Sequence, residues 1–209
     1  LVLTQTLLGL EGLVLCLILM FQVPTRSAAK YNAVGLYYAL CLAGLSGAYV
    51  TYLGYDKIFQ DLAYKLWVLS MICVGAGVFC LLNFGILTSF TDSAKTIFLL
   101  LNVGILAWYI SIVLQTNNNF IVAMLYYMTT CAFMILVFFV KLFKTMDKRV
   151  IYGILGLLTL QVGSVVYQYQ ISLEQFRLGV SSVYQVFVMI SAFLLFLSIR
   201  ALLEKNDNP

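Results

Sequence analysis

Seven long apolar stretches follow one another along the chain, and short segments that carry most of the charged and turn-forming residues separate them. The stretches cover residues 1–23, 33–54, 65–90, 96–115, 120–143, 150–170 and 178–202. A helix needs about 20 apolar residues to cross the hydrocarbon core of a bilayer, and each stretch is long enough. The pattern predicts an all-α integral membrane protein, a bundle of seven transmembrane helices that forms one polytopic domain over residues 1–209.

The composition agrees with this pattern. Hydrophobic residues make up 63% of the 209 positions and charged residues 10%, which is outside the range of soluble domains. Seven spans and their connections use the whole chain, so we expect any function to lie inside the bundle, on its lipid-facing surface or on the loops. Because the sequence begins with Leu1 and not with methionine, we also expect a start residue or a short leader before it.

The basic residues predict the orientation in the membrane, because cytoplasmic connections carry an excess of Lys and Arg. With the N-terminus outside and the C-terminus in the cytoplasm, the outer loops carry Lys57, Lys65 and Arg177. The cytoplasmic segments then carry the other nine of the twelve basic residues, which are Arg26, Lys30, Lys95, Lys141, Lys144, Lys148, Arg149, Arg200 and Lys205. We expect the plasma membrane or a bacterial inner membrane. The dispersed charge argues against a nucleic-acid partner.

One short cytoplasmic connection is notably basic, with Lys141, Lys144, Lys148 and Arg149. Such a cluster attracts anionic lipid headgroups by about 1 kcal/mol per residue. The orientation alone also accounts for it, and a docking site for a cytoplasmic partner is the third interpretation.

Several residue types that membrane enzymes and transporters use are missing. The chain has no histidine, the commonest side-chain base at neutral pH and the commonest zinc ligand. Its five cysteines lie in apolar stretches without a CxxC spacing and are expected to pack in helices; they are Cys16, Cys41, Cys73, Cys80 and Cys131. We therefore expect no metal and no cofactor. The seventh stretch has no lysine for a retinal Schiff base, which argues against a retinal protein. The two prolines, Pro24 and Pro209, lie in the first loop and at the end of the chain, so we expect no proline kink in a spanning helix.

A few polar residues at membrane depth are candidates for function, because ionisable groups are costly there. Glu11 lies inside the first stretch and could bind a proton or a cation, or contact a partner subunit; a structural glutamate nearer the outer interface is the alternative. Ser181 and Gln185 share one helix face, and Gln161 lies in the sixth stretch. Polar faces of this kind could line a narrow polar chamber, or could form hydrogen bonds between helices.

Small and aromatic residues give further expectations about packing. Gly44 with Gly47 and Gly75 with Gly77 are spaced as in helices that approach closely. Tyr37 and Tyr38 lie deeper than the tyrosines of the expected headgroup belt, and we expect them to line the bundle.

Three segments resemble a known clan: GLSGAYVTYLGY at the end of the second helix, LGLLTLQVGSVVYQ in the sixth and SSVYQVFVMISAFLLFLSIRALL in the seventh. They are similar to the seven-helix superfamily of alkaline ceramidases and adiponectin receptors. In that superfamily, a serine followed four residues later by a histidine marks the second helix, and histidines spaced by three residues mark the seventh. Together these residues hold a zinc ion for the hydrolysis of lipid amides. Here Val50 follows Ser46 at the histidine position, and Gln185 and Met189 stand in the second pattern. The resemblance implies a divergent member that kept the fold and lost the zinc ligands.

Three functions follow from these observations. The first, which we favour, is a non-catalytic subunit or scaffold that packs against other integral membrane proteins, binds membrane lipid, or does both. The second is a lipid-binding or hydrolase-like member of the ceramidase clan, with a chamber lined by Ser46, Gln161, Ser181 and Gln185. The third is a small transporter or channel that uses Glu11.

Overall fold

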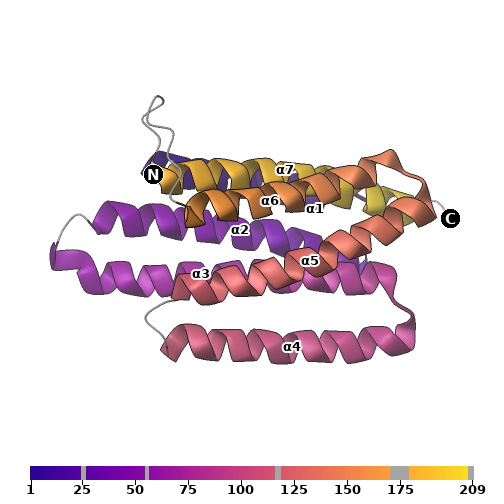
Figure 1. Ribbon diagram of the computed structural model, residues 1–209, viewed down its shortest axis with the longest axis horizontal. Helices are drawn as coiled ribbons and strands as arrows, with labels where there is room; N and C mark the ends of the chain where they lie inside the picture. The colour runs from indigo at the N-terminus through magenta and orange to yellow at the C-terminus, as the bar shows by residue number, and fades with distance from the viewer. Residues whose placement is uncertain (25–26, 55–56, 116–118, 170–178, 207–209) are drawn as a thin grey trace.

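The computed structural model describes residues 1–24, 27–54, 57–115, 119–169 and 179–206. In this part of the chain, seven long α-helices run side by side, and the two termini lie at opposite ends of the bundle (Figure 1). The helices are α1 (Val2–Gln22), α2 (Ala28–Leu53), α3 (Gln60–Ser89), α4 (Asp92–Gln115), α5 (Asn119–Thr145), α6 (Ile151–Gln168) and α7 (Val180–Asn206), with short 3-10 helices η1 (Lys57–Phe59) and η2 (Lys148–Val150).

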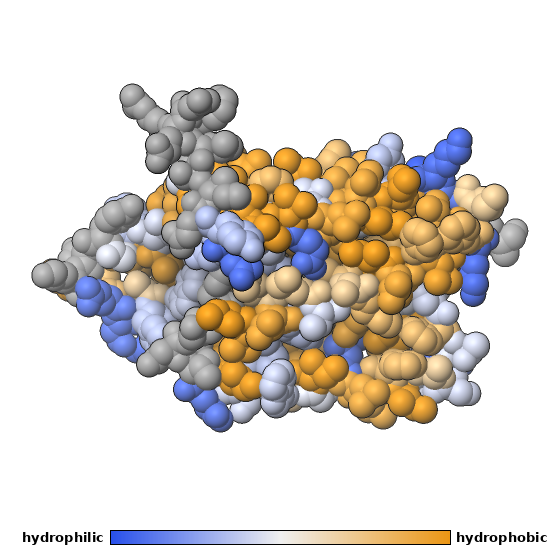
Figure 2. Space-filling view, viewed as in Figure 1, coloured by the Kyte–Doolittle hydropathy of each residue, from blue (hydrophilic) through white to orange (hydrophobic). Residues whose placement is uncertain are grey.

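The seven helices are long and apolar enough to cross a membrane, and hydrophobic side chains cover much of the face drawn in Figure 2. The prediction of an all-α, seven-helix membrane protein is confirmed. The protein is therefore a multi-pass membrane protein. The expected end of the sixth helix at 170 and the start of the seventh at 178 lie outside the described residues.

Helices α2, α3 and α4 begin several residues before the apolar stretches that predicted them, because polar residues form their first turns. The second helix shows the physical reason. Ser27 caps its start by accepting a hydrogen bond from the Lys30 backbone N–H at 3.2 Å. The buried Lys30 ammonium donates to the carbonyls of Met20 and Val23, which are at the end of α1. A cation at a helix C-terminus is favourable, so a lysine that looked like a loop residue joins two helices.

Glycines let α1 and α2 approach until their backbones touch. A Cβ atom on Gly44 would lie 2.6 Å from the Gly9 backbone nitrogen, and one on Gly12 would lie 2.7 Å from the backbone nitrogen of Cys41. A Cβ on Gly47 would lie 3.1 Å from the Gln5 amide. Close packing at Gly44 and at Gly47 is thus confirmed.

Glycines also let the last two helices, α6 and α7, pack closely. A Cβ on Gly156 would lie 2.9 Å from the Ser191 carbonyl oxygen, and one on Gly163 would lie 2.6 Å from Phe187 Cβ. At Gly77, by contrast, a Cβ would make an ordinary contact of 3.5 Å with Ala39. The expectation of close packing was therefore wrong for Gly77, where space for a methyl group exists.

Helix α4 lies at one edge of the bundle, against α3 and α5 (Figure 1). Two polar side chains hold it there. Asn102 donates from Nδ2 to Asn83 Oδ1 at 2.8 Å, and the Tyr109 hydroxyl donates to the Met71 carbonyl at 2.7 Å. The Tyr109 ring fits over Gly75, where a Cβ would lie 2.1 Å from the ring. The glycine of α3 thus provides the recess that seats the tyrosine of α4.

Replacing Gly75 by alanine should destabilise the bundle by about 1–3 kcal/mol, because the added methyl group overpacks against the Tyr109 ring. The control is Gly104→Ala on α4, where no atom lies within 4 Å of the added Cβ. Both variants gain the same roughly 0.5–1 kcal/mol of helix propensity. The measurement is reversible unfolding in mixed micelles. Equal stability of the two variants would show that Tyr109 is not seated on Gly75.

Candidate ligand site inside the bundle

A cavity of about 200 Å³ lies between the helices. Its described lining residues come from α1, α2, α3, α5, α6 and α7, so every helix except α4 contributes to its wall. Gln5, Trp67 and Tyr184 line it near the helix ends on the N-terminal side of the bundle, and Leu195 lines it near the middle of α7. The cavity thus extends from that side toward the centre of the bundle.

The wall of the cavity is mostly apolar. Small residues on facing helices leave the space, and branched aliphatic side chains surround it; they include Ala43, Gly77, Ala123, Leu8, Leu36, Leu40, Val74, Val78 and Val188. None of the lining residues that the structure describes is Asp, Glu, Lys or Arg. A wall of this composition favours a molecule that is neutral and largely hydrocarbon.

A chain of hydroxyl groups runs from α7 through α5 to α6, and its first two members, Tyr184 and Tyr127, line the cavity. Tyr184 Oη donates to Tyr127 Oη at 3.4 Å, and the hydroxyl groups of Tyr127 and Ser164 are 2.5 Å apart. Ser164 Oγ donates its single proton to the Leu160 carbonyl at 2.9 Å. Tyr127 must therefore be the donor to Ser164, and the chain of protons ends on a backbone carbonyl.

Gln185 lies beside Tyr184 on α7 and lines the same cavity. Its Oε1 atom is buried and has no hydrogen-bond partner among the described residues. Two other lining groups, by contrast, donate to backbone carbonyls: Tyr37 to Ala192 at 3.1 Å and Ser70 to Ala43 at 3.1 Å. A buried acceptor without a partner costs about 1–3 kcal/mol, so Gln185 Oε1 marks a position where a bound molecule could donate a hydrogen bond.

The other residues expected to line a polar chamber lie elsewhere. Gln161 forms a hydrogen bond with the Cys131 thiol, and Cys131 lines the cavity, so Gln161 supports the wall from behind. Ser46 Oγ donates to the Leu42 carbonyl of its own helix at 2.6 Å. Ser181 is in the first turn of α7, half-buried and one turn before Gln185. The cavity therefore includes Gln185, and it is far less polar than the chamber that the sequence suggested.

Glu11 lies one turn beyond the cavity-lining Leu8 on α1 and is partly buried. Its Oε2 atom is buried without a hydrogen-bond partner among the described residues. The carboxyl group interacts electrostatically with the hydroxyl group of Tyr37, which itself lines the cavity. The carboxyl group therefore belongs to the surroundings of the cavity but not to its described lining.

The tyrosines divide according to helix geometry. Tyr37 is 1% exposed and lines the cavity, as expected, whereas Tyr38 is 54% exposed. The expectation was wrong for Tyr38, because successive residues of an α-helix point about 100° apart and cannot both face inward. Sequence reasoning also missed the hydroxyl chain of Tyr127, Ser164 and Tyr184. These residues come from three helices, and no spacing along the chain connects them.

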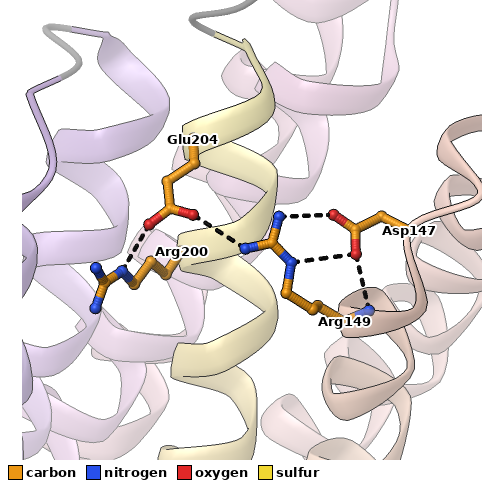
Figure 3. A network of polar contacts seen from close by, with 4 residues as sticks. All are labelled: Asp147, Arg149, Arg200 and Glu204. Atoms are coloured by element: carbon orange, nitrogen blue, oxygen red, sulfur yellow. Dashed lines mark hydrogen bonds and ion pairs between the residues drawn. The ribbon is translucent and has the colours of Figure 1, made fainter.

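The basic connection between α5 and α6 is partly structural (Figure 3). Arg149 pairs with Asp147 at 3.0 Å and with Glu204 at 3.1 Å, and Glu204 also accepts from Arg200 at 2.7 Å. This network ties the η2 segment to the end of α7. A further basic residue of the cluster, Lys141, donates from Nζ to the Thr88 carbonyl of α3, while the side chains of Lys144 and Lys148 are exposed. Arg26 and Arg177, which the sequence places in a cytoplasmic and an outer connection, lie outside the described residues.

The comparisons with known proteins place the chain in one family. No curated protein and no solved structure matches it. A family model matches residues 1–204, which is nearly the whole bundle from α1 into the last turns of α7. The protein therefore belongs to that family, a family of unknown function designated DUF6962.

Proposed function

We propose that this chain is a non-catalytic seven-helix membrane protein that binds a neutral, largely apolar small molecule, such as a lipid, between its helices. The observation that supports the proposal most strongly is the cavity of about 200 Å³, whose lining residues come from six helices. Interior sites between helices of a bundle are a common place for ligands. The uncharged wall favours hydrocarbon over ions.

The chemistry around the cavity supports binding rather than catalysis. The sequence has no histidine, and the described residues contain no group of three or more His, Cys, Asp and Glu side chains arranged to hold a metal ion. The hydroxyl chain from Tyr184 ends on the Leu160 carbonyl, and a carbonyl cannot take a proton from a nucleophile as a general base does. These hydroxyl groups therefore have structural partners and no activating group.

The size of the cavity limits the ligand. An engineered protein cavity of about 150 Å³ lined by apolar side chains holds a benzene molecule. By proportion, about 200 Å³ accommodates roughly eight non-hydrogen atoms. We infer a small amphiphile, or the end of a longer lipid that enters the cavity from the bilayer.

The outer face of α4 favours a second role, as a subunit of a membrane complex. Leu100, Leu101, Ile105 and Trp108 form a shallow apolar groove there together with Gly104 and Ile97, and no atom lies within 4 Å of a Cβ built on Gly104. Glycine on a lipid-facing surface permits the close approach of another helix.

The first prediction concerns the cavity, and it uses Trp67 as a reporter. The chain has two tryptophans; Trp67 lines the cavity, and Trp108 is 62% exposed on α4. In a Trp108→Phe background, bromobenzene should quench Trp67 with a saturable component. Val188→Phe should remove that component because the larger ring fills the cavity. The matched control is Val186→Phe, at a position 38% exposed. Saturable quenching that persists in Val188→Phe would contradict the proposal.

The second prediction concerns orientation, for which we propose an external N-terminus and a cytoplasmic C-terminus in the plasma membrane or a bacterial inner membrane. Lys65, before the apolar part of α3, and Lys148, in η2, are both exposed. With a membrane-impermeant maleimide, Lys65→Cys should react in intact cells, and Lys148→Cys should react only after permeabilisation. The unmodified chain measures the background from its own five cysteines. The reverse labelling pattern would refute the orientation.

The third prediction concerns the α4 groove. If the chain is a subunit, a second polypeptide should co-purify with it from its native membrane after gentle extraction, and Gly104→Leu should reduce that polypeptide at least tenfold in quantitative mass spectrometry. The control is Gly179→Leu, because Gly179 also has open space around its Cβ position. A polypeptide that survives Gly104→Leu would place the interface elsewhere, and the absence of any stoichiometric polypeptide would exclude the subunit role.

A further inference from the structure

One side chain in the wall of the cavity offers a hydrogen-bond acceptor to a ligand. The hydroxyl protons of Tyr184 and Tyr127 are both donated within the hydroxyl chain, and those of Tyr37 and Ser70 go to backbone carbonyls. Among the described residues that line the cavity, the buried polar side-chain atom that lacks a partner is Gln185 Oε1. An amide oxygen accepts hydrogen bonds and cannot donate them. A ligand that satisfies this atom must therefore bring a donor.

The absence of charged side chains among the described lining residues further limits which ligands can bind. No Lys or Arg is among the described lining residues, so a carboxylate or phosphate group would be buried without a cation. Burying an unpaired charge is far more costly than burying a neutral hydroxyl group. The carboxyl group of Glu11, which interacts electrostatically with Tyr37, adds no positive charge near the cavity. Both observations favour a neutral ligand.

Resting on the ligand-binding function proposed above, we propose that the cavity is selective for a neutral alcohol. In the complex, the hydroxyl group at one end of a hydrocarbon chain donates to Gln185 Oε1. The chain itself lies against the aliphatic side chains of the wall. An ether or an alkane of the same size fills the same space and leaves Gln185 Oε1 unpaired, so it binds more weakly.

The test compares three probes of nearly equal size by displacement of bromobenzene from the cavity. The protein is the full chain with Trp108→Phe, in nanodiscs of phosphatidylcholine, and concentrations are corrected for partition into the bilayer. 1-Heptanol carries a donor, methyl hexyl ether is its isomer without one, and heptanoate is an anion. Because one net hydrogen bond changes affinity by about tenfold, 1-heptanol should restore Trp67 fluorescence at about one tenth of the ether concentration. Heptanoate at neutral pH should restore none.

A variant links this preference to the proposed acceptor. Gln185→Met keeps a side chain of similar length and removes the acceptor, so 1-heptanol and the ether should compete equally while bromobenzene still binds. The matched control is Gln168→Met on α6, where the side chain is exposed and the preference for the alcohol should persist. If Gln185→Met does not fold, the comparison of the three probes on the unsubstituted site decides the question.

Each outcome separates this inference from the proposed function. If bromobenzene causes no saturable quenching, both the ligand-binding function and the alcohol selectivity are overturned. If bromobenzene binds but 1-heptanol and the ether compete equally, the cavity binds ligands and the selectivity is overturned. Competition by heptanoate as strong as that by 1-heptanol overturns the selectivity as well, and so does a preference for the alcohol that survives Gln185→Met.

Discussion

The hydrocarbon interior of a bilayer offers no hydrogen-bond partner, and this constraint governs where each polar side chain of the bundle lies. A polar group at that depth must find its partner inside the protein or remain unsatisfied at a cost. Ser46 therefore bonds to its own helix, Asn102 bonds across to Asn83 on α3, and Lys30 turns back to the carbonyls of α1. Five buried side-chain atoms of the described residues, Gln185 Oε1 among them, have no such partner. An unsatisfied atom at this depth carries more information than the same atom would in a soluble protein, because water cannot satisfy it.

The close approach of helices creates both the stability of the bundle and its cavity. Where glycines face each other, as at Gly44 and Gly9, backbones touch and no space remains. Where small residues on several helices face a common centre instead, as Ala43 and Ala123 do, their side chains do not fill the space between the helices, and a cavity remains. Helix α4 contributes none of the described lining residues, and the residues that it buries against the bundle are Asn102, Tyr109 and Val113.

The fold could be predicted from the sequence because length and hydrophobicity alone decide whether a segment spans a membrane. The site could be predicted only in part. Gln185 was identified from its position on an inward face, but an equally plausible serine, Ser46, was satisfied by its own helix turn, which a sequence pattern does not reveal. The helix starts were predicted too late because residues such as Lys30 were taken to mark loops, whereas their hydrocarbon stems can be buried while the charge caps a helix.

The seating of Tyr109 over Gly75 also restricts how the sequence can change over time. A Cβ on residue 75 would lie 2.1 Å from the ring, so a larger residue there overpacks against the ring while the tyrosine is present. A smaller side chain at position 109, by contrast, leaves an empty recess and removes the hydrogen bond to the Met71 carbonyl. The cost of a substitution at one of the two positions therefore depends on which residue already occupies the other. Their effects are not independent, and a methyl group at position 75 costs less in a sequence that has already lost the aromatic ring.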